Sequence, residues 1–162
     1  MKSTAFIGQA MPRIKRNPHD WPSLNKWLYS IGLNDKLIRK HFLYSALVDY
    51  FPGAVNGSHK VPTEREINKE KRRLKKTLIK FKPEIVVPVG KLSISYCLNE
   101  GFGALSDVIG NTYHANPYSL LEHEVRVVPL PHPSGASTWR HKEENKKLLQ
   151  KALGLLKKEL EI

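Results

Sequence analysis

Four short apolar runs, separated by segments with helical character, constrain the fold of this chain more than any other feature. None of the runs alternates cleanly between apolar and polar residues, which is typical of strands covered on both faces. Strands that alternate with helices along a chain favour a mainly parallel sheet between helical layers. We therefore predict an α/β fold, a three-layer αβα sandwich with a central four-stranded sheet. The predicted strands are Ala5–Ile7, Phe42–Val48, Ile85–Val89 and Val125–Leu130.

The segments between these runs carry helix signals. Thr63 and Glu66 match a Thr-x-x-Glu capping box at the start of one helix, and Lys82-Pro83 follows its end. Another segment begins with Pro22 and stops at Gly32, and a third is followed by Gly101. The predicted helices are Pro22–Gly32, Thr63 to about Lys80, Leu92–Asn99 and Trp139 to about Leu160.

Size and composition limit the class of protein. A chain of 162 residues that is 40% apolar predicts one domain, residues 1–162, with room for a core. No apolar run approaches the length of a membrane span, and the N-terminus lacks the features of a signal peptide. We therefore expect a cytoplasmic protein without membrane contact, and a monomer. The single cysteine, Cys97, lies in an apolar segment and predicts a buried, inert thiol.

The charge balance points to an acidic partner. The chain has 27 Lys and Arg against 15 Asp and Glu, a net charge of +12, which favours nucleic acid. Part of this charge falls in Lys69–Lys82, where apolar residues at helical spacing predict an amphipathic helix with a basic outer face. Contact with DNA and simple solvation of that face are both compatible with the pattern.

The stretch from Val127 to Trp139, VVPLPHPSGASTW, carries the most specific functional signal. A strand that ends at His132 and turns into a helix places an imidazole beside exposed backbone N–H groups. That arrangement suits an anion, either a phosphate or the charge that develops on a leaving group. The alternative is a proline-rich turn with Ser137 or Thr138 as the helix N-cap, and the pattern alone favours this alternative.

Taken with three other motifs, this stretch resembles the uracil-DNA glycosylase superfamily. The likeness extends over nearly the whole chain and is closest to the thermophile-type branch around residues 42–92. The iron–sulfur cysteines of that branch are absent, so we expect no cluster, no other cofactor and no metal. The four motifs, in the order of the family, are the loop Gly8–Pro12, Pro52-Gly53 followed by Pro62–Glu66, the strand Lys82–Gly90, and His132-Pro133-Ser134.

The resemblance implies an activity and a set of roles. The family flips a nucleotide out of DNA and breaks its N-glycosidic bond, leaving negative charge on the uracil. His132 matches the neutral histidine that donates to a uracil oxygen. Trp21 is the candidate for stacking on the base, and the alternative, a tryptophan that packs in the core, is at least as well supported. The other implied roles are water positioning by Gln9, pocket shape by Gly8, Ala10 and Met11, base-edge recognition by Ser45, and DNA phosphate binding by Ser134, Gly135, Ser137 and Lys91.

The first loop departs from the family pattern. Many members place an acidic residue there to activate water, and this chain has Gln9 and Ala10. A glutamine can orient water by hydrogen bonding but has no useful basicity near neutral pH. Met11 stands where a proline is usual. Asp20 and Asp49 are candidate substitute bases, although residues of this kind are more often simply turn or solvent-exposed carboxylates.

These departures leave two functions open. Retention of His132 favours a DNA-repair glycosylase, whereas Gln9 and a serine, Ser45, in place of the family's asparagine favour a weak or inactive relative that binds nucleic acid through the same cleft. A hydrolase that uses Ser134 with His132 is disfavoured, because no Gly-x-Ser-x-Gly elbow or acid partner is present. Metal catalysis is disfavoured because the histidines show no ligand spacing.

Overall fold

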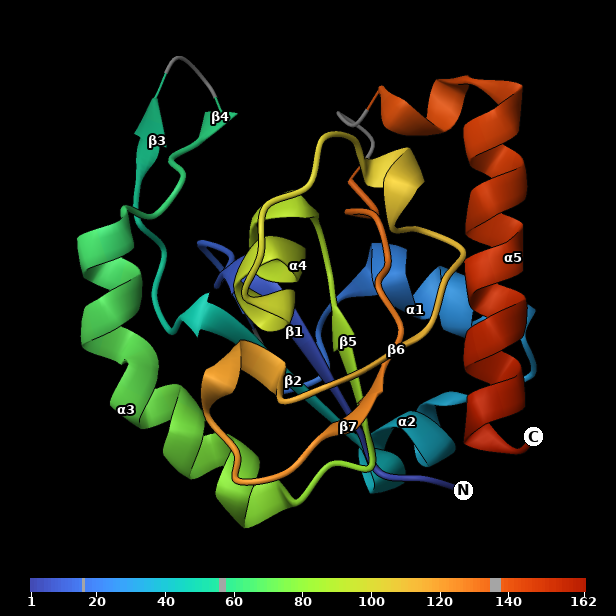
Figure 1. Cartoon of the computed structure of the whole chain (residues 1–162), viewed down its shortest axis with the longest axis horizontal. Helices are drawn as coiled ribbons and strands as arrows, with labels where there is room; N and C mark the ends of the chain where they lie inside the picture. Colours follow the sequence, from blue (N-terminus) through green and yellow to red (C-terminus); the bar gives the residue numbers. More distant parts are fainter. Residues whose placement is uncertain (16, 56–57, 135–137) are drawn as a thin grey trace.

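The computed structural model describes residues 1–15, 17–55, 58–134 and 138–162, and its centre is a five-stranded sheet (Figure 1). The strand order is β2-β1-β5-β7-β6, in which the first four strands are parallel and β6 runs antiparallel to β7. The mainly parallel α/β fold is therefore confirmed. The strands are β1 Thr4–Ala10, β2 Phe42–Val48, β5 Ile85–Pro88, β6 Tyr113–Ala115 and β7 Val125–Val127, with a separate hairpin of β3 Ala54–Val55 and β4 Ser58–His59.

The prediction of four strands is wrong by one, because the sheet also includes β6. This edge strand has three residues and none of them is fully buried, so it lacks the apolar run by which the other strands were recognised. The runs predicted to end at Val89 and Leu130 extend past the observed strands as an isolated parallel bridge between those two residues. Pro129 and Pro131 flank Leu130 and have no N–H to donate to a ladder.

Helices cover both faces of the sheet (Figure 1). One face packs against the third and fourth helices through residues such as Leu74 and Cys97. The other packs against the first, second and fifth helices through residues such as Leu28, Ile38 and Leu153. The helices are α1 Pro22–Ser30, α2 Asp35–His41, α3 Glu64–Phe81, α4 Lys91–Leu98 and α5 Glu143–Leu160, with short 3-10 turns η1 Leu105–Asp107, η2 Pro117–Ser119 and η3 Trp139–His141.

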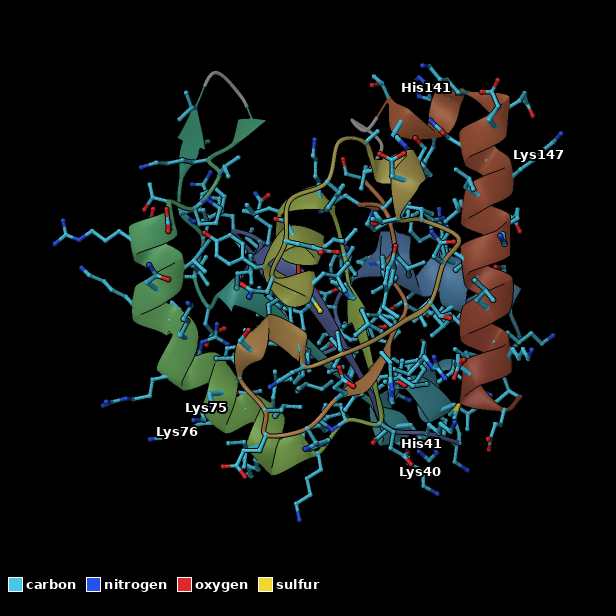
Figure 2. The ribbon with its side chains drawn as sticks, in the orientation of Figure 1. Lys40, His41, Lys75, Lys76, His141 and Lys147 are labelled. Carbon is cyan, nitrogen blue, oxygen red and sulfur yellow. The ribbon has the colours of Figure 1, made fainter. Side chains whose placement is uncertain are left out.

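The sequence signals placed α3 well. The Thr63 hydroxyl accepts from the backbone N–H of Glu66, whose carboxylate accepts from the backbone N–H of Thr63, so the capping box is confirmed. Leu74 is buried while Lys75 and Lys76 are exposed, which confirms the basic outer face. Figure 2 shows these two lysines on α3 at the far side of the molecule from His141.

Other helix predictions need correction. The last α-helix begins at Glu143, not at Trp139, and its N-cap is Lys142 rather than Ser137 or Thr138. The intervening residues form η3, whose Trp139 carbonyl accepts from the Asn145 side chain, 2.7 Å. The short α2 was not predicted. Helix α4, Lys91–Leu98, differs from the predicted Leu92–Asn99 by one residue at each end, and its C-cap is Asn99 in the left-handed conformation rather than Gly101.

The expected environment of Cys97 is confirmed. The thiol is fully buried, and burial raises its pKa to about 12. None of the helices in the described part of the chain combines the length and apolarity needed to cross a bilayer.

Candidate active site

A pocket of about 400 Å³ lies at the carboxyl ends of β1 and β2, where parallel sheets place their sites. A larger pocket of about 870 Å³ lies at the opposite ends of the strands, near Lys82 and Glu84, and contains no residue of the expected site. All the residues to which the sequence assigned base recognition or chemistry line the first pocket: Gly8, Gln9, Ala10, Met11, Trp21, Ser45 and His132. The structure brings them together; their roles remain predictions.

The imidazole of His132 is held by its own turn. The backbone N–H of Ser134 donates to Nδ1 of His132, 3.1 Å away. A ring nitrogen that accepts an N–H carries no proton, so the neutral ring has its proton on Nε2. Gly90 lies against the ring with φ +90°, and a Cβ there would be 3.7 Å from the His132 Cβ. The N–H donor of the neutral ring is therefore at Nε2, on a residue that lines the pocket beyond the end of β7.

Trp21 lies between the pocket and the core. Its ring centroid is 6.0 Å from that of His132 and 6.1 Å from that of Tyr44, which it meets edge to face. A Cβ at position 8 would lie 2.9 Å from the Trp21 ring, so Gly8 is what allows the indole to approach β1. The indole both packs against the core cluster and lines the pocket, so its core contact is confirmed and base stacking stays a prediction.

A hydrogen-bond network that the sequence did not reveal fixes the segment leading to Trp21. The Tyr44 hydroxyl donates to Asn25 Oδ1, 2.6 Å, and Asn25 Nδ2 donates to the His19 carbonyl, 3.1 Å. The His19 ring in turn donates from Nε2 to the Phe42 carbonyl, 2.7 Å. Burial raises the pKa of Tyr44, so its phenol stays protonated as a donor. The network ties the loop before α1 to β2 beneath the pocket.

Arg140 supports the His-Pro-Ser turn from the outside. Its Nη2 donates to the carbonyls of Ser134, 2.7 Å, and Pro133, 3.4 Å, while the guanidinium lies 5.5 Å from the Trp27 ring centroid. The residue therefore ties the turn to α1. Its sequence context, a charged stretch with other basic residues, gave no signal that would have distinguished it.

Ser45 borders the pocket, but its hydroxyl is engaged from the side of α3. Arg73 Nη1 donates to Ser45 Oγ, 3.1 Å, and Nη2 donates to the Ala46 carbonyl, 2.7 Å. A hydroxyl that accepts one hydrogen bond can still donate its own proton. Ser45 is therefore left with one donor to offer, fewer groups than an asparagine amide would provide.

A match to a family model identifies the protein family. The model described as the Uracil DNA glycosylase superfamily matches residues 3–157. The chain belongs to this superfamily. The resemblance drawn from the four motifs is therefore confirmed over almost the full length. Comparison with individual curated proteins gives no significant match.

The acid–base groups of this superfamily member are arranged differently from the usual pattern. Gln9 lines the pocket at the position where many members have an acid. Among the described lining residues, Asp20 is the only carboxylate. Asp49 lies outside this pocket, and its backbone N–H donates to Glu70 Oε1, 2.7 Å. Of the two substitute bases that the sequence left open, Asp20 is therefore the one at the site.

The residues expected to bind DNA phosphates are only partly placed. Ser134 is half-buried in the turn beside His132, whereas Gly135 and Ser137 lie outside the described residues. Lys91 is exposed at the start of α4 and does not line the pocket; its Nζ donates to the Gly103 carbonyl, 3.2 Å. Within the described ranges, no group of three or more His, Cys, Asp or Glu side chains could hold a metal ion.

Proposed function

We propose that this superfamily member is a DNA glycosylase that hydrolyses the N-glycosidic bond of uracil, or of another deaminated base, flipped out of DNA. Family membership supports a glycosylase-like function in DNA repair. The observation that carries the finer proposal is the hydrogen bond from Ser134 N–H to His132 Nδ1, in a pocket that also holds Trp21. This bond leaves the neutral imidazole with a proton on Nε2.

The chemistry follows from these groups. When the glycosidic bond breaks, its electron pair leaves with the base and positive charge develops on the sugar. A donor on Nε2 of His132 stabilises the anion on the base oxygen. The face of Trp21 supplies a surface on which a flipped base stacks. Water adds to C1′ of the sugar, oriented by the Gln9 amide, and its proton passes to the Asp20 carboxylate or to solvent.

Affinity for DNA comes from charge. The net charge of +12 favours a polyanion, and Lys15 and Lys60 line the pocket into which a flipped nucleotide would enter. In this proposal the Ser134 hydroxyl adds a phosphate contact beside the histidine, since its backbone N–H is engaged by His132.

The second candidate is a weak or inactive relative that binds nucleic acid through the same cleft. Two observations favour it: Gln9 takes the position of the usual acid, and the Ser45 hydroxyl is already engaged by Arg73. Such a protein would bind DNA as the glycosylase does but would release no base, or release it only slowly.

An oligonucleotide cleavage assay tests the proposal. Duplexes and single strands that contain uracil, hypoxanthine or xanthine are incubated with the protein, and alkali then cuts the backbone wherever a base was lost. Wild-type protein should release at least one of these bases. His132→Ala should strongly reduce release while leaving DNA binding in place, and the exposed His141→Ala on η3 is the matched control that should change neither. DNA binding with no release of any base would establish the second candidate.

A further inference from the structure

Lys15 is an unusual lysine for a DNA-binding surface. It borders both the active-site pocket and the adjacent pocket along β2, and its side chain is half-buried. Its Nζ donates to the thioether sulfur of Met11, 3.6 Å away, which is a weak acceptor. Lys60, the other lysine of the active-site pocket, is exposed. The amine of Lys15 thus lies partly buried where the two pockets meet, with a weak acceptor as a hydrogen-bond partner.

Burial shifts the protonation equilibrium of Lys15 toward the neutral amine. Burial lowers the pKa of Lys15, and the negative charges of Asp49 and Asp20 only partly oppose that effect. A neutral amine is a nucleophile, whereas an ammonium is not. Lysines that react with carbonyl carbons are typically found in such desolvated positions.

The product of base release contains a suitable carbonyl carbon. Once the base has left and water has added, the sugar is a hemiacetal that opens to an aldehyde at C1′. We propose that Lys15 Nζ forms a Schiff base with the C1′ aldehyde of an abasic nucleotide, which gives the protein a lyase activity on abasic DNA. The inference rests on the proposed function, since it requires that the pocket accept a flipped nucleotide.

The reaction balances without any external oxidant or reductant. The Nζ lone pair adds to C1′ to give a carbinolamine, and the former carbonyl oxygen leaves as water when the C=N bond forms. The iminium then acidifies the C2′ hydrogen. Loss of that proton to solvent places its electron pair in a C2′=C3′ double bond, and the phosphate on C3′ departs with the electrons of the C3′–O bond. Hydrolysis of the imine returns the free lysine.

Borohydride trapping on DNA with a preformed abasic site tests this proposal. Cyanoborohydride reduces the imine to a stable secondary amine, which is seen as a protein–DNA adduct on a denaturing gel. Wild-type protein should form the adduct, and mass spectrometry of the digested adduct should place the sugar on Lys15. Lys15→Arg has no amine that can form the imine, so its adduct should fall by about tenfold or more. Its affinity for abasic DNA is measured in parallel at the same salt concentration, and trapping is compared at saturating protein so that weaker binding cannot account for a lost adduct.

Lys26→Arg is the matched control. Lys26 is exposed on α1 and lines no part of the active-site pocket, so its variant should trap DNA as wild type does. An adduct that persists in Lys15→Arg, or that maps to Lys60 or to the N-terminal amine, would overturn the assignment, as would the absence of any adduct with wild type. Because the abasic site is made beforehand, failure to release a base would not prevent trapping, and the two proposals can fail separately.

Discussion

The backbone N–H of Ser134 donates to Nδ1 of His132 across 3.1 Å, within a single turn. The ring is thereby oriented by a neutral backbone group. A carboxylate in that position would instead favour an imidazolium. A neutral ring with its proton on Nε2 can donate a hydrogen bond to the oxygen of a leaving base. This relationship gives the first prediction.

Replacing His132 tests the value of its donor. We expect His132→Ala to lower the single-turnover rate of base release by about 10²–10³-fold, the usual loss when one preorganised donor to a developing anion is removed. His132→Gln keeps an N–H donor and should retain more activity than alanine. Both rates are measured with saturating protein, so that binding does not limit them. Equal rates in the two variants would contradict a donor role.

Gly8→Ala tests the approach of Trp21 to β1. The new Cβ would meet the indole at 2.9 Å, so the ring must shift within the pocket. We expect kcat/KM for base release to fall by about tenfold while the protein stays folded, since Trp21 is only half-buried and can move. Gly103→Ala, on a loop away from this pocket, is the control for the general cost of losing a glycine.

Arg140→Met tests the support of the His-Pro-Ser turn. The change removes hydrogen bonds to two turn carbonyls while keeping most of the aliphatic volume over Trp27. Urea titration should show a free energy of unfolding lower by about 1–3 kcal/mol, the usual cost of losing hydrogen bonds to a charged group. The base-release rate should fall as well, because the turn that orients His132 loosens. Arg39→Met on the exposed face of α2 should leave both quantities unchanged.

The salt dependence of DNA binding distinguishes the basic surfaces. Lys60 lines the active-site pocket, whereas Lys75 lines the pocket at the other end of the strands and lies beside Lys76 on α3 (Figure 2). We expect Lys60→Gln to reduce the slope of log K against log salt by about 0.9, the value of one phosphate contact on duplex DNA. The double change Lys75→Gln and Lys76→Gln should leave the slope unaltered. A reduced slope in the double variant would instead assign DNA contact to the α3 face.

The buried thiol of Cys97 gives a probe of unfolding. Burial raises its pKa to about 12, so at pH 8 the native thiol is protonated and enclosed. A thiol reagent such as Ellman's reagent should label it only as fast as the protein opens, and much faster in urea. Rapid labelling of native protein would contradict this burial.

The same burial predicts a pH dependence of stability. Because the unfolded thiol ionises at lower pH, the free energy of unfolding should fall as pH rises from the ordinary thiol range toward about 12.

Local patterns were sufficient for most of the fold. The β2 bounds, Phe42–Val48, and the capping box of Thr63 were predicted as observed, because they depend on residues adjacent in the chain. The short edge strand β6 and the helix α2 were missed. Each has too few residues to establish a period, and β6 is defined by pairing with β7 rather than by its own composition.

The sequence by itself determined four of the five strands and the parallel sense of those four. It thereby determined the edge of the sheet at which the motif residues gather, because carboxyl ends of parallel strands meet at one edge. Only the tertiary structure decided what surrounds each of these residues. Three features depend on groups that the fold brings together in space. They are the hydrogen bond that sets the His132 tautomer, the hydrogen bonds from Arg140 to the turn carbonyls, and the partial burial of Lys15. Tautomer, support and nucleophilicity are properties of those surroundings, and no local pattern in the chain encodes them.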